Sequence, residues 1–137
     1  DYPAVTSDYL PTIMEILAVE PIDARPMDGL SLMPVLREGI AERPFPIAFE
    51  TRGRAGNMVS RNSPGLALIG NRYKLLTDIS ASGEEDQLYD LHTDPGESNS
   101  LVVEQSERVT SMKDVLHTWR LSCLASDGGA DYPIALP

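Results

Sequence analysis

Three closely spaced arginines are the side chains in this sequence best suited to holding a ligand. Arg52, Arg54 and Arg61 lie in the polar, glycine-containing stretch from Glu50 to Pro64. A guanidinium group donates paired, charge-assisted hydrogen bonds to planar or tetrahedral anions. We therefore interpret these arginines as candidate contacts for an anionic ligand. The alternative is a solvated loop, because most loop arginines face water and only some loops carry binding residues.

Residues of the types that perform catalysis or bind metals are few. The chain has one cysteine, Cys123, and two histidines, His92 and His117. Neither histidine has partners at the spacing that a zinc or acid–base site needs, so both are expected at the surface. Asp90 and Asp94 lie around a turn, where an aspartate commonly accepts hydrogen bonds from backbone N–H groups. The sequence therefore predicts no catalytic residue and no metal ligand in this stretch.

The overall charge excludes two classes of partner. The 137 residues include 21 acidic and 11 basic side chains, which gives a formal net charge of −10. Nucleic acids and anionic membranes bind through clusters of Lys and Arg, so neither is expected as a partner.

No apolar run approaches the roughly 20 residues that cross a bilayer. A hydrophobic fraction of 42%, with 11 prolines and 10 glycines, is typical of a loop-rich globular chain.

Short apolar runs separated by turn residues predict a small antiparallel sheet. Gly70 and Asn71 join two of these runs in a tight hairpin, and an Asp-Pro-Gly turn follows the last run. Lys74 alternates with apolar neighbours, as in a strand with one solvated face, so we interpret this lysine as structural. The expected strands are Ile47–Phe49, Leu66–Ile69, Arg72–Leu76 and Gln87–Leu91.

Two short helices are predicted before the sheet. The first has Asp8 as its N-cap and is ended by Pro21. Its apolar stripe consists of Leu10, Ile13, Met14 and Leu17. The second spans about two turns between Ser31 and Gly39, and its leucines are expected to pack against the first helix.

A longer helix is predicted from Glu104 to Ser122. Its apolar stripe consists of Val109, Met112, Val115, Leu116 and Trp119. Such a stripe packs across a sheet, which leaves Lys113, Asp114 and Arg120 towards solvent. Together the elements predict an α+β fold: a small antiparallel sheet of three to four strands packed against a C-terminal helix and preceded by two short helices.

Several short motifs resemble the C-terminal region of sulfatases in the alkaline-phosphatase-like superfamily. They are D-x-x-P-T at 8–12, D-G-x-S-L at 28–32, YKLL at 73–76, LYDL at 88–91, DPGE at 94–97 with Asn99 after it, and a tail containing Ser126, Gly129 and Asp131-Tyr132. The resemblance spans nearly the whole chain. It implies that residues 1–40 are a helical segment flanking the catalytic α/β domain of a full-length sulfatase, and that residues 41–137 are its C-terminal subdomain.

The resemblance also identifies what this stretch lacks. A sulfatase carries its nucleophile in a C-x-P-S-R or S-x-P-S-R segment, whose Cys or Ser is oxidised to formylglycine. No such segment occurs here, and Cys123 has neither the Pro nor the Arg at the required spacing. The resemblance implies calcium and formylglycine for the parent protein, with the metal ligands before Asp1. We therefore expect a C-terminal fragment of a sulfatase-like hydrolase of sulfuric esters, inactive by itself.

The same resemblance implies the partners. These are the upstream catalytic domain of the same chain and, through it, a sulfated substrate; a periplasmic or secreted location is also implied. In isolation the first helix needs another cover, so we expect it either to repack on the chain's own sheet or to form a homo-oligomer. Two alternative functions remain: a non-catalytic module that binds an acidic ligand through the stretch from Arg52 to Arg61, and the C-terminal part of a related phosphodiesterase or phosphonate hydrolase.

Overall fold

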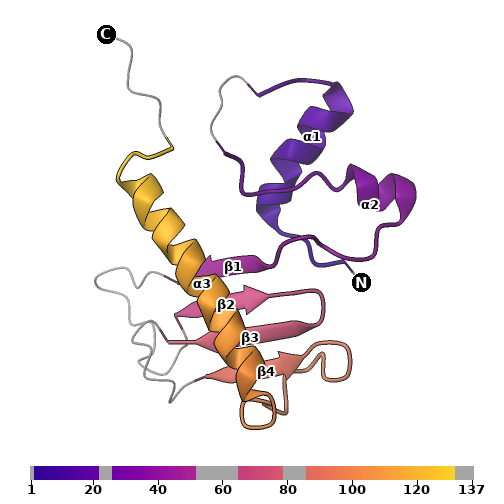
Figure 1. The fold of residues 1–137 in the computed structure, drawn as a ribbon. Helices are drawn as coiled ribbons and strands as arrows, with labels where there is room; N and C mark the ends of the chain where they lie inside the picture. Colours follow the sequence, from indigo (N-terminus) through magenta and orange to yellow (C-terminus); the bar gives the residue numbers. More distant parts are fainter. Residues whose placement is uncertain (1, 22–25, 52–64, 79–85, 132–137) are drawn as a thin grey trace. The chain divides into compact units, whose positions relative to one another are not determined.

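The fold is known from a computed structural model that describes residues 2–21, 26–51, 65–78 and 86–131. The chain divides into a helical unit, Asp1–Pro44 with Leu121–Pro137, and a sheet unit, Phe45–Arg120, and each is described by itself. The boundary that the resemblance implies at residue 40 stays a prediction. The elements in chain order are η1 (Thr6–Asp8), α1 (Tyr9–Leu17), α2 (Met33–Glu38), β1 (Ile47–Glu50), β2 (Leu66–Ile69), β3 (Tyr73–Thr77), β4 (Gln87–Asp90) and α3 (Ser106–Asp127) (Figure 1).

The sheet unit contains one antiparallel sheet of four strands in the order β1-β2-β3-β4. With two short helices before it and a long helix after it, this sheet confirms the predicted α+β fold. β2 has the predicted bounds, and the other strands differ from prediction by a single residue at one or both ends. Element ends are the least regular positions of a strand, so shifts of this size leave the topology unchanged.

The hairpin between β2 and β3 is present, but its turn lies one residue later than predicted. The N–H of Gly70 donates to the carbonyl of Tyr73 at 2.9 Å, which centres the turn on Asn71 and Arg72. Among the described residues, positive φ angles occur at Ala18, Gly39, Glu97 and Gly129. This turn therefore does not use the left-handed region that its glycine and asparagine make accessible.

The hydrophobic core of the sheet unit lies between the sheet and α3, which crosses one face of the sheet (Figure 1). The strand register places Leu68, Leu75 and Leu88 in one row across β2, β3 and β4. α3 contributes Val109 and Leu116 to the same cluster. Because alternate residues of a strand face opposite sides, this single register buries a leucine on each of the three strands.

α3 continues past its predicted end at Ser122. Its basic side chains form ion pairs in addition to the apolar contacts of its stripe. Trp119 packs, partly buried, against the core cluster. Asp114 is exposed, as predicted. The prediction that Lys113 and Arg120 face solvent was wrong: Lys113 Nζ lies 2.7 Å from Asp86, and Arg120 Nε lies 3.5 Å from Glu50. Long basic side chains extend along an apolar surface to reach acidic partners at its edge. Across the described ranges, neither α3 nor any other helix is long and apolar enough to cross a bilayer.

The helical unit differs from prediction at its helix ends and in its packing. α1 ends at Ala18, in the left-handed conformation at φ 52°, before Pro21 is reached. α2 ends at Gly39 with φ 67°, as predicted. The expectation that the leucines of α2 pack against α1 was wrong for Leu36, which is 73% exposed. Helical spacing identifies an apolar face but not whether this chain covers it.

Candidate functional site

The three arginines predicted to bind an anion lie outside the described residues. The structure does define the base of the stretch that carries Arg52, Arg54 and Arg61. The N–H of Thr51, directly after β1, donates to the carbonyl of Gly65, directly before β2, at 2.8 Å. The two ends of the stretch are therefore held side by side by the β1–β2 pairing, and the role of the arginines stays a prediction.

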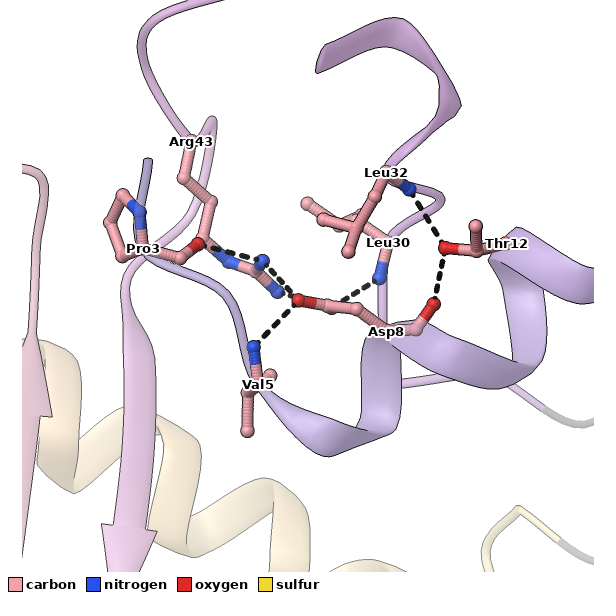
Figure 2. Close-up of polar contacts among 7 residues, drawn as sticks. All are labelled: Pro3, Val5, Asp8, Thr12, Leu30, Leu32 and Arg43. Carbon is pink, nitrogen blue, oxygen red and sulfur yellow. Dashed lines mark hydrogen bonds and ion pairs between the residues drawn. The ribbon is translucent and has the colours of Figure 1, made fainter. Parts of the chain in front are cut away.

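The most buried polar site in the described structure is centred on Asp8, whose side chain has no exposed surface (Figure 2). Arg43 donates to the two carboxylate oxygens of Asp8, from Nη1 at 2.8 Å and from Nη2 at 2.9 Å. Backbone N–H groups complete the site, from Leu30 at 2.8 Å and from Val5 at 2.9 Å. The carboxylate is thus fully satisfied by one cation and two amides, as a buried charge requires.

The residues around Asp8 also join the two N-terminal motifs to one another. The hydroxyl of Thr12 donates to the backbone carbonyl of Asp8 at 2.6 Å and accepts from the N–H of Leu32 at 2.9 Å (Figure 2). Gly29 lies so close to the backbone of Ser7 that an added Cβ would collide with it. The D-x-x-P-T and D-G-x-S-L motifs therefore specify a single packed joint between α1 and the segment that leads to α2.

The electrostatics of this joint favour a permanently ionised pair. Burial by itself raises the pKa of Asp8, but the hydrogen bonds from Arg43, Leu30 and Val5 outweigh it and lower the pKa to about 2. The hydrogen bond to Asp8 likewise raises the pKa of Arg43. A general base needs a pKa near the working pH. Asp8 is consequently suited to holding the fold rather than to moving protons.

The sequence prediction placed Asp8 correctly at the start of α1 but misassigned its bonds. Asp8 occupies the N-cap position of α1, yet its side chain makes no capping hydrogen bond. The carboxylate points instead towards Arg43, which is 35 positions later in the chain. Local sequence patterns carry no signal for a pair at this separation, and Arg43 was therefore missed.

A second buried aspartate lies at the end of β4. Asp90 is 5% exposed, and its carboxylate accepts hydrogen bonds from the Nε and Nη2 atoms of Arg72, the shortest at 2.7 Å. It also accepts from the N–H of His92 at 3.1 Å, which confirms the predicted turn bond. The hydrogen bonds from Arg72 hold the pKa of Asp90 well below its usual range. Its main partner is therefore a cation that the sequence prediction did not name.

The turn after β4 was predicted more completely. Asp94 accepts hydrogen bonds from the N–H groups of Ser98 and Asn99, both at 2.8 Å, which confirms its structural role. Lys74 reaches this turn from β3, with Nζ 2.7 Å from both carboxylate oxygens of Glu97. Glu97 itself has a positive φ of 54°. Lys74 thus stabilises a turn with an unfavourable backbone conformation, in agreement with its interpretation as structural.

The basic side chains of the described residues are engaged within the protein. The ion pairs are Arg37–Glu15, Arg43–Asp8, Arg72–Asp90, Lys74–Glu97, Lys113–Asp86 and Arg120–Glu50. Arg108 stacks on Tyr73, with its guanidinium carbon 4.0 Å from the ring centroid, and its Nε donates to Gln105. These contacts brace turns and strand ends, and none of them forms an open cluster of cations for a ligand.

The described residues do not fit the metal or cofactor that the resemblance implies. Calcium is held by several converging oxygen ligands. Within the described ranges no group of three or more His, Cys, Asp or Glu side chains could hold a metal ion. His92 and His117 are exposed, as predicted. Cys123 lies within α3, and Ala125 and Asp127 stand where a formylglycine segment has its Pro and its Arg, so it does not match such a segment.

Comparisons with solved structures identify the fold. BT1596, described as a 2-O GAG sulfatase, is 24% identical with a TM-score of 0.54, and the match covers 91% of this chain and 25% of that one. BT4656, solved in complex with its substrate D-glucosamine-2-N,6-O-disulfate, is 21% identical with a TM-score of 0.59, covering 82% and 23%. Ps i-CgsB is 18% identical with a TM-score of 0.68, covering 87% and 24%.

The extent of these matches places the chain within a larger architecture. No protein-family model and no curated protein sequence matches it. The chain spans about a quarter of the length of the solved structures that it matches. BT1596 is described as a sulfatase, and so is a further match, a putative sulfatase from Bacteroides thetaiotaomicron that is 25% identical with a TM-score of 0.55. The chain therefore has the fold of part of a sulfatase, consistent with the C-terminal region that its sequence motifs resemble.

Proposed function

We propose that this chain is the C-terminal region of a sulfatase-like hydrolase of sulfuric esters, in which it supports the catalytic domain and shapes one wall of the substrate cleft. The observation that carries the proposal is the match of 82 to 91% of the chain to about a quarter of each sulfatase structure. A periplasmic or secreted location belongs to the same proposal.

We assign the chemical step to the preceding part of such a protein. The buried carboxylates of this chain are bonded to cations of the chain itself, as Asp8 is to Arg43 and Asp90 is to Arg72. Carboxylates held in this way are poor ligands for calcium and poor proton acceptors, because their lone pairs are occupied. The formylglycine nucleophile and the calcium would therefore come from residues before Asp1, and the chain by itself would be inactive.

Arg52, Arg54 and Arg61 are our candidates for contacts to the sulfated substrate. The proposal is supported by the engagement of the described basic side chains in contacts within the protein. It is also supported by the hydrogen bond from the N–H of Thr51 to the carbonyl of Gly65, which holds the two ends of the stretch together. Binding residues are often carried by segments that a rigid scaffold anchors in this way.

A hydrolase assay tests the proposed activity. The 137-residue chain and the longer polypeptide encoded by its gene are incubated with calcium and either 4-nitrophenyl sulfate or a sulfated glucosamine. We expect hydrolysis by the longer polypeptide and none above buffer by the chain. Sulfate release by the chain would overturn the assignment of the chemistry. Cleavage of phosphodiesters in place of sulfate esters by the longer polypeptide would favour a related phosphodiesterase.

The same assay tests the arginines one at a time. Arg52→Ala, Arg54→Ala and Arg61→Ala in the longer polypeptide are each expected to raise KM by about tenfold, since one charge-assisted hydrogen bond contributes roughly 1.5 kcal/mol. Arg37→Ala is the matched control, because its side chain is 61% exposed and pairs loosely with Glu15 at 3.4 Å. An unchanged KM in all three variants would remove the arginines from the substrate site.

A further inference from the structure

One ion pair joins the last residue of β1 to α3. Glu50 ends β1, and the strand register places it in one row with Leu66 and Thr77. Because Leu66 belongs to the core cluster beneath α3, this row lies on the face of the sheet that α3 covers. Arg120 Nε lies 3.5 Å from the carboxylate of Glu50. The pair therefore connects the end of an edge strand to the helix that packs on the sheet.

This pair is shielded from solvent more than an ordinary surface pair. The side chain of Glu50 is 17% exposed and that of Arg120 is 29% exposed. The Nε atom of Arg120 is itself buried and makes no hydrogen bond to the residues that the structure describes. A buried cationic group without a hydrogen bond depends on a nearby opposite charge. The carboxylate of Glu50 is that charge, so loss of either side chain leaves the other without its partner.

The pair also lies beside the base of the stretch that carries the candidate substrate arginines. Thr51 directly follows Glu50, and its N–H donates to the carbonyl of Gly65 at 2.8 Å. Successive residues of a strand are only about 3.3 Å apart, so a displacement of Glu50 displaces Thr51 with it. The contact of Arg120 with Glu50 therefore bears directly on the hydrogen bond that holds the two ends of the stretch together.

We infer that Arg120 is a positioning residue for the candidate substrate site: through Glu50 it fixes the end of β1, which the three candidate arginines follow in the chain. The inference rests on the proposed function, because that function makes these arginines contacts to the sulfated substrate. Arg120 acts on the fraction of molecules in which the base is correctly formed. The apparent affinity for a ligand falls in proportion to that fraction.

A second ion pair of α3 offers a matched control. Lys113 precedes Arg120 by about two turns on the same side of the helix, and its Nζ lies 2.7 Å from Asp86. Asp86 also accepts a hydrogen bond from the hydroxyl of Thr77 and directly precedes β4, the opposite edge strand. The two pairs thus join the same helix to the sheet with the same types of charge. Of these two pairs, that of Arg120 is the one next to Thr51.

Kinetics of the longer polypeptide with 4-nitrophenyl sulfate test the inference. Arg120→Gln should raise KM about five- to tenfold and leave kcat within about twofold, because the chemical step is assigned to the preceding part of the protein. Arg120→Lys restores a cation and should return KM to within about threefold of the parent. Lys113→Gln should leave KM within about twofold of the parent. Glutamine is a good helix former, so both substitutions preserve α3.

Substitution of the partner gives an independent check. Glu50→Gln should raise KM as Arg120→Gln does, and the double variant should raise it no further, since both substitutions remove the same pair. An unchanged KM in Arg120→Gln would overturn the inference. Equal increases of KM in Arg120→Gln and Lys113→Gln would also overturn it, because they would indicate a general loss of packing by α3.

Amide hydrogen exchange distinguishes failure of this inference from failure of the proposed function. In the same polypeptide, peptides that contain Thr51 should exchange at least about threefold faster in Arg120→Gln and at the parent rate in Lys113→Gln, because the bond to Gly65 opens more often. Faster exchange at Thr51 without sulfatase activity in the parent would refute the proposed function and keep the anchoring by Arg120. Unchanged exchange in an active polypeptide would overturn the anchoring and keep the proposed function.

Discussion

Arg43 places both terminal nitrogens on the carboxylate of Asp8, at 2.8 and 2.9 Å, across 35 positions of sequence. The Asp8 side chain is fully buried and that of Arg43 is 5% exposed. Removing one member of such a pair leaves an uncompensated buried charge, which is far more costly than removing both. This relationship makes the joint between α1 and the segment before β1 the most sensitive polar site of the helical unit.

Asp8→Asn should destabilise the chain by about 3 to 5 kcal/mol, because it leaves the guanidinium of Arg43 buried without a counter-charge. The measurement is the free energy of unfolding from urea titrations followed by circular dichroism. Glu15→Gln is the matched control, since its pair with Arg37 is exposed and should contribute less than about 1 kcal/mol. Equal effects of the two substitutions would contradict the buried pair.

Stability should fall in acid through the titration of Asp8. Its pKa in the folded chain is about 2, below the ordinary value of 3.8, so ionised Asp8 favours the folded state. This contribution, about 2 kcal/mol, is fully present above pH 3.8 and is lost as the pH falls through about 2. Urea midpoints measured from pH 5 to pH 2 should fall more steeply for the parent chain than for Asp8→Asn. Parallel pH profiles would exclude Asp8 as the titrating group.

Gly29→Ala should destabilise the chain, whereas Gly70→Ala should leave its stability unchanged or slightly raised. An added Cβ at Gly29 would collide with the carbonyl of Ser7, so we expect a loss of about 1 to 3 kcal/mol. At Gly70 the nearest atom would be the carbonyl oxygen of Tyr73 at 3.5 Å, an ordinary contact. There the reduced entropy of the unfolded chain should leave stability unchanged or raised by about 0.5 kcal/mol. Thermal unfolding compares the two directly, and a stable Gly29→Ala chain would refute the close packing of the two motifs.

Leu75→Ala should remove a large part of the stability of the sheet unit. Leu75 is fully buried in the central row of the sheet, and truncating it should cost about 2 to 5 kcal/mol. Val103→Ala, at a position that is 86% exposed, should change stability by less than about 0.5 kcal/mol. Chemical denaturation gives both values. A small loss at Leu75 would mean that α3 does not cover this face of the sheet.

The sequence determined much of the sheet unit. Short apolar runs separated by turn residues specified β2 and its neighbours, and the Asp-Pro-Gly turn specified the bonds that Asp94 accepts. Both signals are local, since the period of a strand and the geometry of a turn depend on residues a few positions apart. The resemblance to sulfatases likewise depended on short motifs, and the solved structures agree with it.

Tertiary structure decided which charges meet and which apolar faces this chain covers. The partnership of Asp8 with Arg43, the ion pairs of Lys113 and Arg120, and the exposure of Leu36 were not predicted. A helical stripe has the same spacing whether its own chain or another body buries it, and an ion pair across 35 positions has no local pattern. Such features depend on where the chain returns in space, which residue spacing by itself does not specify.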